Sequence, residues 1–305
     1  MGKAYLSLRP YVEWRAGPWP IDWPGIFGRR APLELEIGFG NGGYLVDRAA
    51  ERPERDFVGV ELGWESVRRA LRRTAKADLA NVRILKADAR VVLERLFAPG
   101  SIDRAYCLFP CPWPKEKHER HRLFSSEFLR LLNGRLAPEG EVRVVTDHRP
   151  FLDWVLERTP GTGFDEEWRT IPPGFDTKYE KKWRETGRTE FYDLTLRKRE
   201  EIAAAPKEEI ELKVHTLKEF DPERFEPEGV RGDVTVEFKD YLYDPVRERA
   251  MARVYVVEET LHQGFWIEIV RMRSGWRVRP AQGSSILPTL GVQKALDAVR
   301  DSASR

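Results

Sequence analysis

The feature that most constrains this chain is a glycine-rich stretch close to its start. Apolar Leu33, Leu35 and Ile37 alternate with Glu34 and Glu36, which is the period of a β-strand. Four glycines then fall within six residues, and a helical pattern of apolar side chains follows. Strand, glycine turn and helix open a nucleotide-binding βαβ unit, in which glycines admit a ligand close to the backbone. The alternative is a tight turn that binds nothing.

Strand and helix patterns alternate after this stretch. Strands are predicted at 56–61, 81–89, 102–109 and 141–147, helices at 64–78, 89–97, 124–136 and 149–158, and an antiparallel closing strand at 191–196. This alternation predicts an α/β fold with a doubly wound, mostly parallel sheet. Ligands of such sheets bind outside the carboxyl ends of the strands.

Polar residues recur at the predicted strand ends. Glu61 ends the second strand and Asp88 the third, while Cys111 and Asp147 lie at or just past later ends. An acid at the end of the second strand accepts hydrogen bonds from ribose hydroxyls in dinucleotide folds. Each residue alone could be an exposed strand-end side chain, but together on one rim they favour a ligand site.

The composition changes along the chain and predicts four parts. Residues 1–32 form a Pro- and Trp-rich arm, 33–198 the α/β domain, 199–208 a linker and 209–305 a small α+β module closed by a helix at 289–302. The arm is expected to bury its aromatic side chains rather than to bind a ligand. The module carries no catalytic motif, and its role stays open between stabilisation and RNA contact.

The overall composition excludes several classes. No run of 18 apolar residues and no signal peptide occurs, which predicts a cytoplasmic protein without membrane segments. Cys107 and Cys111 make no disulfide framework, and no Cys/His spacing predicts a metal site. The net charge of +2 does not require a nucleic-acid partner, although local clusters can still bind one. Arg outnumbers Lys, which slightly favours a thermophilic source over GC-rich codons. Monomer and homodimer both stay open.

Two basic segments suggest what the site acts on. Pro110, Pro112 and Pro114 enclose Trp113 in a stiff loop, and four cations and two histidines follow at 115–122. A second segment, 172–184, mixes four cations with aromatic residues. Cations position phosphates and aromatic rings stack on bases, so both segments favour RNA. The alternative for each is a solvated, charged helix.

From about residue 33 to 196 the chain resembles the tRNA (guanine-N7-)-methyltransferase family. The matching motifs are Glu36-x-Gly38-x-Gly40, Glu61, Asp88-Ala89, Pro110-x-Pro112-Trp113-Pro114-Lys115-x-Lys117-His118, Thr146-Asp147 and Thr177-x-Tyr179-Glu180. The proline–tryptophan loop and the Thr-x-Tyr-Glu element are specific to the family. The first three motifs are generic to class I methyltransferases with a Rossmann-like fold, and the C-terminal module lies outside the resemblance.

The resemblance implies a function and roles for individual residues. It implies methyl transfer from S-adenosylmethionine to N7 of a tRNA guanine, in the variable loop, with tRNA as the partner. The residues implied for the cofactor are Glu36, Gly38, Gly40, Glu61, Asp88, Ala89 and Cys111. Those implied for the guanosine are Lys115, Asp147, Thr177, Lys178, Tyr179 and Glu180, of which Asp147 and Glu180 are the expected catalytic residues.

One residue departs from the family pattern. The family usually has Asp where this chain has Cys111. Either the acid is dispensable, a neighbour substitutes for it, or the activity is altered; Cys111 itself is expected to act through its backbone or by packing. Guanine N7 is a bare acceptor, so no base has to remove a proton before methyl transfer. A carboxylate such as Glu180 can accept from N1–H and N2–H and so reject adenine.

Two rival functions stay open. A dinucleotide-dependent oxidoreductase fits Gly38-x-Gly40-x-x-Gly43 formally, but it lacks a hydride-transfer partner and gives the basic segments no purpose. A non-catalytic RNA-binding relative gains support from Cys111.

Overall fold

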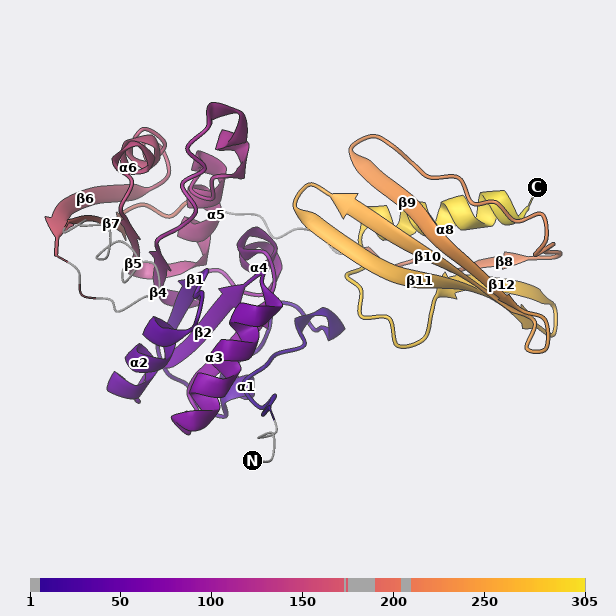
Figure 1. Ribbon diagram of the computed structural model, residues 1–305, viewed down its shortest axis with the longest axis horizontal. Helices are drawn as coiled ribbons and strands as arrows, with labels where there is room; N and C mark the ends of the chain where they lie inside the picture. The colour runs from indigo at the N-terminus through magenta and orange to yellow at the C-terminus, as the bar shows by residue number, and fades with distance from the viewer. Residues whose placement is uncertain (1–5, 173, 175–189, 204–209, 305) are drawn as a thin grey trace. The chain divides into compact units, whose positions relative to one another are not determined.

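The computed structural model describes residues 6–172, 174, 190–203 and 210–304. The chain divides into two compact units, Met1–Pro206 and Lys207–Arg305, each with its own sheet (Figure 1).

The first unit is built on a seven-stranded sheet with the order β3-β2-β1-β4-β5-β7-β6. Neighbours from β3 to β5 run parallel, whereas β7 is antiparallel to both β5 and β6. The strands are β1 (Leu33–Ile37), β2 (Asp56–Glu61), β3 (Val82–Lys86), β4 (Ile102–Leu108), β5 (Leu136–Thr146), β6 (Phe164–Ile171) and β7 (Phe191–Lys198). The predicted doubly wound, mostly parallel sheet is confirmed.

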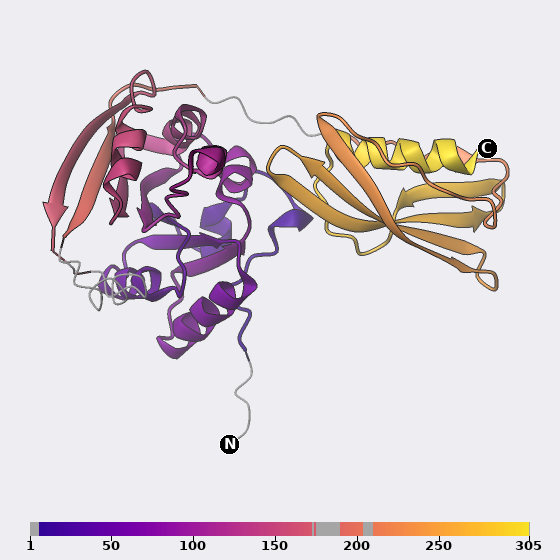
Figure 2. The same cartoon turned by 45° about the horizontal axis from the view of Figure 1, so that its top comes forward.

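Helices connect the parallel strands and cover both faces of this sheet (Figures 1 and 2). The described helices of this unit are α1 (Trp23–Phe27), α2 (Gly43–Glu51), α3 (Trp64–Lys76), α4 (Ala89–Arg95), α5 (Ser126–Arg135) and α6 (Arg149–Leu156), with short 3-10 turns η1 (Trp14–Ala16) and η2 (Glu116–His121); α2 to α5 connect the parallel strands. The apolar stripe of α3 shows why they pack: Val67, Ala70 and Leu71 are fully buried, while arginines occupy the opposite face. The N-terminal arm pairs with β3 at Ile84 and buries Trp14.

The second unit is a five-stranded antiparallel sheet, order β8-β12-β11-β10-β9, with one helix, α8, along one face (Figure 2). Its elements are β8 (His215–Leu217), β9 (Val234–Asp244), β10 (Arg249–Glu258), β11 (Leu261–Met272), β12 (Gly275–Pro280) and α8 (Leu290–Ala303). Alternate residues of β10, Ala252, Val254 and Val256, share a core with Val292 and Leu296 of α8. The predicted α+β module is confirmed. Among the described residues, no helix has the length and apolar character needed to cross a bilayer.

Candidate functional site

The glycine loop after β1 turns the chain into α2 and leaves room above it. Gly38 and Gly40 have φ of +71° and +57°, in the left-handed region that favours glycine. A Cβ on either residue would meet no atom within 4 Å, so their backbone faces open space. Gly42 differs, because a Cβ there would lie 2.6 Å from the Cβ of Ala70 in α3. The first two glycines therefore leave space above the loop, whereas Gly42 allows the close approach of α3.

Glu61, at the end of β2, is bonded to this loop. Its Oε2 accepts a hydrogen bond from Gly40 N at 3.0 Å, and its Oε1 accepts from Leu62 N at 2.8 Å and Gly63 N at 3.1 Å. The carboxylate is thus held by three backbone donors at the mouth of the glycine loop. This is the position from which an acid reaches a ribose in this class of sheet.

Glu36, near the end of β1, is buried, and one of its carboxyl oxygens lacks a hydrogen-bond partner among the described residues. Only 4% of the residue is exposed, and its Oε2 has no hydrogen-bond partner among the described residues. Burial, and secondly the charge of Glu61, raise the pKa of Glu36 to about 8. A ligand that brings a positive charge and a donor would satisfy it, and S-adenosylmethionine carries both a sulfonium and an ammonium group.

The end of β3 lies at the same edge of the sheet as the end of β2. Asp88 caps α4 by accepting from Arg90 N at 2.8 Å, and Ala87 N donates to Glu61 O at 3.1 Å, which ties the end of β3 to that of β2. Beside them, Leu62 is 63% exposed and Trp64 42% exposed. Sequence reasoning missed both, although an apolar residue directly after a strand-end acid was a usable signal. They give exposed apolar surface directly after the strand-end acid Glu61.

The proline loop follows β4 and carries a cluster of rings. The ring centroid of Trp113 lies 5.7 Å from that of His118 and 5.2 Å from that of His121. The Lys115 side chain, on the same loop, is exposed. Phe109 N donates to Val145 O of β5 at 2.7 Å, so the loop starts directly beside the strand that leads to Asp147.

The two cysteines differ in environment. Cys111 is exposed, so packing, one of its two expected roles, is not what the structure shows. Cys107 is buried in β4, and burial, followed by the charges of Glu36 and Glu61, raises the pKa of its thiol. It therefore stays protonated and is no nucleophile.

The sheet order brings most of the predicted residues to one edge. Parallel β3, β2, β1, β4 and β5 are successive neighbours, so their carboxyl ends share that edge. The residues at these ends are Asp88, Glu61, Glu36, Cys111 with Lys115, and Asp147. The predicted residues Thr177, Lys178, Tyr179 and Glu180 lie outside the described residues. In the part of the chain that the structure describes, no group of three His, Cys, Asp or Glu could hold a metal ion.

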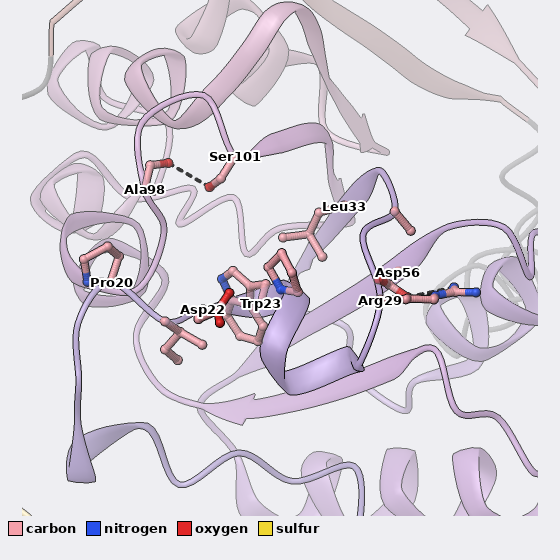
Figure 3. Close-up of a pocket in the computed structure, with 11 residues that line it drawn as sticks. Pro20, Asp22, Trp23, Arg29, Leu33, Asp56, Ala98 and Ser101 are labelled. Carbon is pink, nitrogen blue, oxygen red and sulfur yellow. Dashed lines mark hydrogen bonds and ion pairs between the residues drawn. The ribbon is translucent and has the colours of Figure 1, made fainter.

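A cavity of about 480 Å³ lies at the opposite edge (Figure 3). Trp23 of the N-terminal arm lines it, together with Leu33 and Asp56 at the starts of β1 and β2 and Ser101 before β4. Arg29 reaches across to Asp56, with 2.7 Å between Nη2 and Oδ1. Because doubly wound sheets bind ligands at the carboxyl ends of their strands, this cavity is not the predicted site.

The chain is similar to one family model and to several known proteins. Residues 30–193 match a family model described as "Putative methyltransferase". A tRNA (guanine-N(7)-)-methyltransferase of Chlorobium phaeobacteroides is 46% identical over 170 residues, 56% of this chain and 83% of that one. One of Aquifex aeolicus is 30% identical over 298 residues, 95% of this chain and 97% of that one. Among solved structures, the 16S rRNA methyltransferase KamB has a TM-score of 0.48 and 18% identity, and the match covers 59% of this chain and 93% of KamB.

The matched residues 30–193 contain the glycine loop, the strand-end acids and the proline–tryptophan loop, which are the parts that the sheet brings to one edge. The Aquifex relative extends the similarity through the second unit. The resemblance stated from the sequence motifs is confirmed: this chain belongs to the tRNA (guanine-N7-)-methyltransferase family.

Proposed function

We propose that this protein transfers a methyl group from S-adenosylmethionine to N7 of a guanine in the variable loop of tRNA. The observation that supports the proposal is the shared edge of the sheet, where three strand-end acids stand beside the proline loop and Asp147. A cofactor on one half of this edge and a base on the other half would meet above β1 and β4.

The described residues fit the cofactor. On this proposal the cofactor approaches the backbone at Gly38 and Gly40, where a Cβ would meet no atom within 4 Å. Its ribose hydroxyls bond to Glu61, and its positive group bonds to Oε2 of Glu36, which has no partner among the described residues. When bound, S-adenosylmethionine supplies an already activated methyl group. The protein therefore has to bind, orient and shield the reactants.

The acceptor side needs alignment and a negative charge. N7 has no proton to lose, so the main catalytic gain is orientation, which contributes up to ~7–11 kcal/mol in favourable cases. Methylation makes the guanine cationic, and on this proposal Asp147, which directly follows β5, stabilises that charge. On this proposal Lys115 contacts the guanosine, and Glu180 with the Thr177–Tyr179 segment reads its Watson–Crick edge.

Cys111 does not prevent this chemistry. Cys111 is exposed on a loop that starts at Phe109, whose N–H bonds to Val145 O of β5, and on this proposal Asp147, two residues after Val145, supplies the carboxylate. We expect Cys111→Asp to leave the product unchanged and to alter only the rate.

The test is mass analysis of nucleosides from unmodified tRNA incubated with labelled S-adenosylmethionine. We expect 7-methylguanosine, and its loss when the variable-loop guanosine is replaced by adenosine. Glu180→Ala should abolish methylation while the cofactor still binds, whereas Glu61→Ala should weaken cofactor binding first. Methylation of a guanosine elsewhere would contradict the variable-loop assignment.

The same preparation separates the rival functions. Calorimetric titration with S-adenosylmethionine and with NAD distinguishes a methyltransferase from an oxidoreductase. A protein that binds tRNA but transfers no methyl group would be the non-catalytic relative.

A further inference from the structure

Arg122 lies at the end of the charged run that follows the proline loop. A residue in such a run is expected to face solvent, as the Lys115 and Lys117 side chains do. Arg122 instead turns inward and is only 8% exposed. A buried guanidinium is retained where its donors are used, so its contacts show what it does.

The guanidinium of Arg122 is bonded to two consecutive carbonyls of the proline loop. Its Nε donates to Pro112 O at 3.0 Å and its Nη2 donates to Trp113 O at 3.2 Å. Proline has no N–H, so this loop offers few backbone donors and its carbonyls are the main points of attachment. The planar fork of Arg can reach two carbonyls at once, which a Lys ammonium does less well.

The other side of Arg122 is fixed as well. The guanidinium of Arg122 lies 5.1 Å from the ring centroid of Trp154 in α6. The backbone carbonyl of Arg122 accepts a hydrogen bond from Arg90 Nη2 of α4 at 2.9 Å. The Trp154 indole N–H in turn donates to Glu119, which also accepts from Arg158. Arg122 thus joins the loop to two helices of the domain.

The loop needs such a constraint. Phe109 and Trp113, neither of them glycine, have φ of +55° and +42°. Side chains other than glycine rarely adopt this region, and they keep it only where their surroundings enforce it. The two hydrogen bonds from Arg122 are accepted by Trp113 O and by Pro112 O, directly before it, and so restrain the backbone at Trp113.

We propose that Arg122 is a positioning residue for the methyl acceptor. It holds the loop Pro110–Lys115 in one conformation, so that Lys115 and the rings of Trp113, His118 and His121 meet the RNA already arranged. Arg122 does not touch the base. The acceptor part of this proposal rests on the proposed function, whereas the restraint on the loop does not.

The activity test compares Arg122→Ala and Arg122→Lys with Lys115→Ala, a matched variant of a residue on the same loop whose side chain faces solvent. We expect Arg122→Ala to lower kcat at least tenfold, with affinity for S-adenosylmethionine unchanged within twofold. Added guanidinium or methylguanidine should restore part of the Arg122→Ala activity and none of the Lys115→Ala activity. Arg122→Lys should resemble the alanine variant, because it keeps the charge but not the paired bonds. Wild-type kcat in Arg122→Ala would overturn the proposal.

A second measurement does not depend on activity. Hydrogen exchange in the full-length protein should accelerate in peptides covering 110–123 of Arg122→Ala and stay unchanged in peptides covering β1 and β2. If the alanine variant does not fold, the same measurement is made on Arg122→Lys. Unchanged exchange in the loop refutes the restraint whatever the activity. A wild-type protein that methylates no tRNA, while the loop loosens in the variant, refutes the proposed function and leaves the restraint standing.

Discussion

The buried carboxyl of Glu36 makes stability depend on pH. Its pKa is about 8 in the folded protein and near 4.5 when the chain is unfolded, so between these values the folded state binds more protons. Stability therefore falls as the pH rises through this window, by at most about 5 kcal/mol. Glu36→Gln lacks this titrating group. We therefore expect the free energy of unfolding of Glu36→Gln, relative to that of the wild type, to increase from pH 5 to pH 8.5 in denaturant titrations. Exposed Glu65→Gln is the control, and parallel pH profiles for wild type and Glu36→Gln would contradict the prediction.

The same residue predicts a proton signal when the cofactor binds. A cationic ligand beside Glu36 favours its ionised form, so at pH 7 binding should release close to one proton per S-adenosylmethionine, within about 0.3. Calorimetric titrations in buffers of different ionisation enthalpy measure this number directly. Glu36→Gln should bind with no such release; an equal release in both proteins would place the proton elsewhere.

Single residues differ in how far the sequence could predict them. Glu61 and Gly40 follow from a strand, a turn and an acid, because β-strand periodicity fixes where a strand ends. The inward turn of Arg122 could not be predicted, since an arginine at the end of a charged run has the pattern of an exposed side chain. Its environment comes from Trp154, 32 residues later in the chain.

At the scale of elements, one buried ion pair joins β5 to β7. Asp193 is 3% exposed and accepts from Arg143 Nε at 2.8 Å and Nη2 at 3.0 Å. Asp193→Ala leaves a partly buried guanidinium without this partner and should cost about 2–3 kcal/mol, reduced from the fully buried case because Arg143 is partly exposed. Urea unfolding at constant m-value measures the change.

The neighbouring pair between β6 and β7 supplies the control. Glu167 and Arg197 lie 2.7 Å apart, Oε2 to Nη1, but both side chains are exposed. Glu167→Ala should cost less than about 0.5–1 kcal/mol, since exposed pairs are screened by water. Equal losses in the two variants would show that burial does not decide the strength of these pairs.

Elements were predictable where their periodicity was strong. The helices and parallel strands of the first unit follow from alternation of apolar patterns, and α3 was predicted at 64–78 and found at Trp64–Lys76. The strand β6 was not predicted, because Asp165–Thr170 are all exposed and lack the apolar alternation of a buried strand. Pairing with β7 and ion pairs such as Asp165–Arg199 hold it instead.

At the scale of the whole molecule, the two units have separate cores, so ligand effects should be confined to one of them. We expect the fragment 1–206 to bind S-adenosylmethionine as the full chain does, and calorimetry of the full chain to show two transitions. Cofactor at 100 times Kd should stabilise only the first unit, by about 2.7 kcal/mol. A single transition that shifts as a whole would show that the units unfold together.

The fold of the second unit was predictable, and its role was not. Alternation of apolar residues along β10 fixes which face meets α8. A functional site needs several chemically active side chains close together. Where such residues come from different strands, they are far apart in the sequence and meet only in the folded sheet, so the sequence of the second unit does not reveal its role. The Aquifex relative carries a matching region, so the unit is shared within the family.

The restraint on the proline loop also bears on how RNA would associate. Prolines with fixed φ, and carbonyls held by a buried guanidinium, mean that the loop loses its conformational entropy when the chain folds. When the nucleic acid binds, this loop therefore loses little further conformational entropy. The association should be fast and governed by diffusion and charge, without a slow folding step of the proline loop.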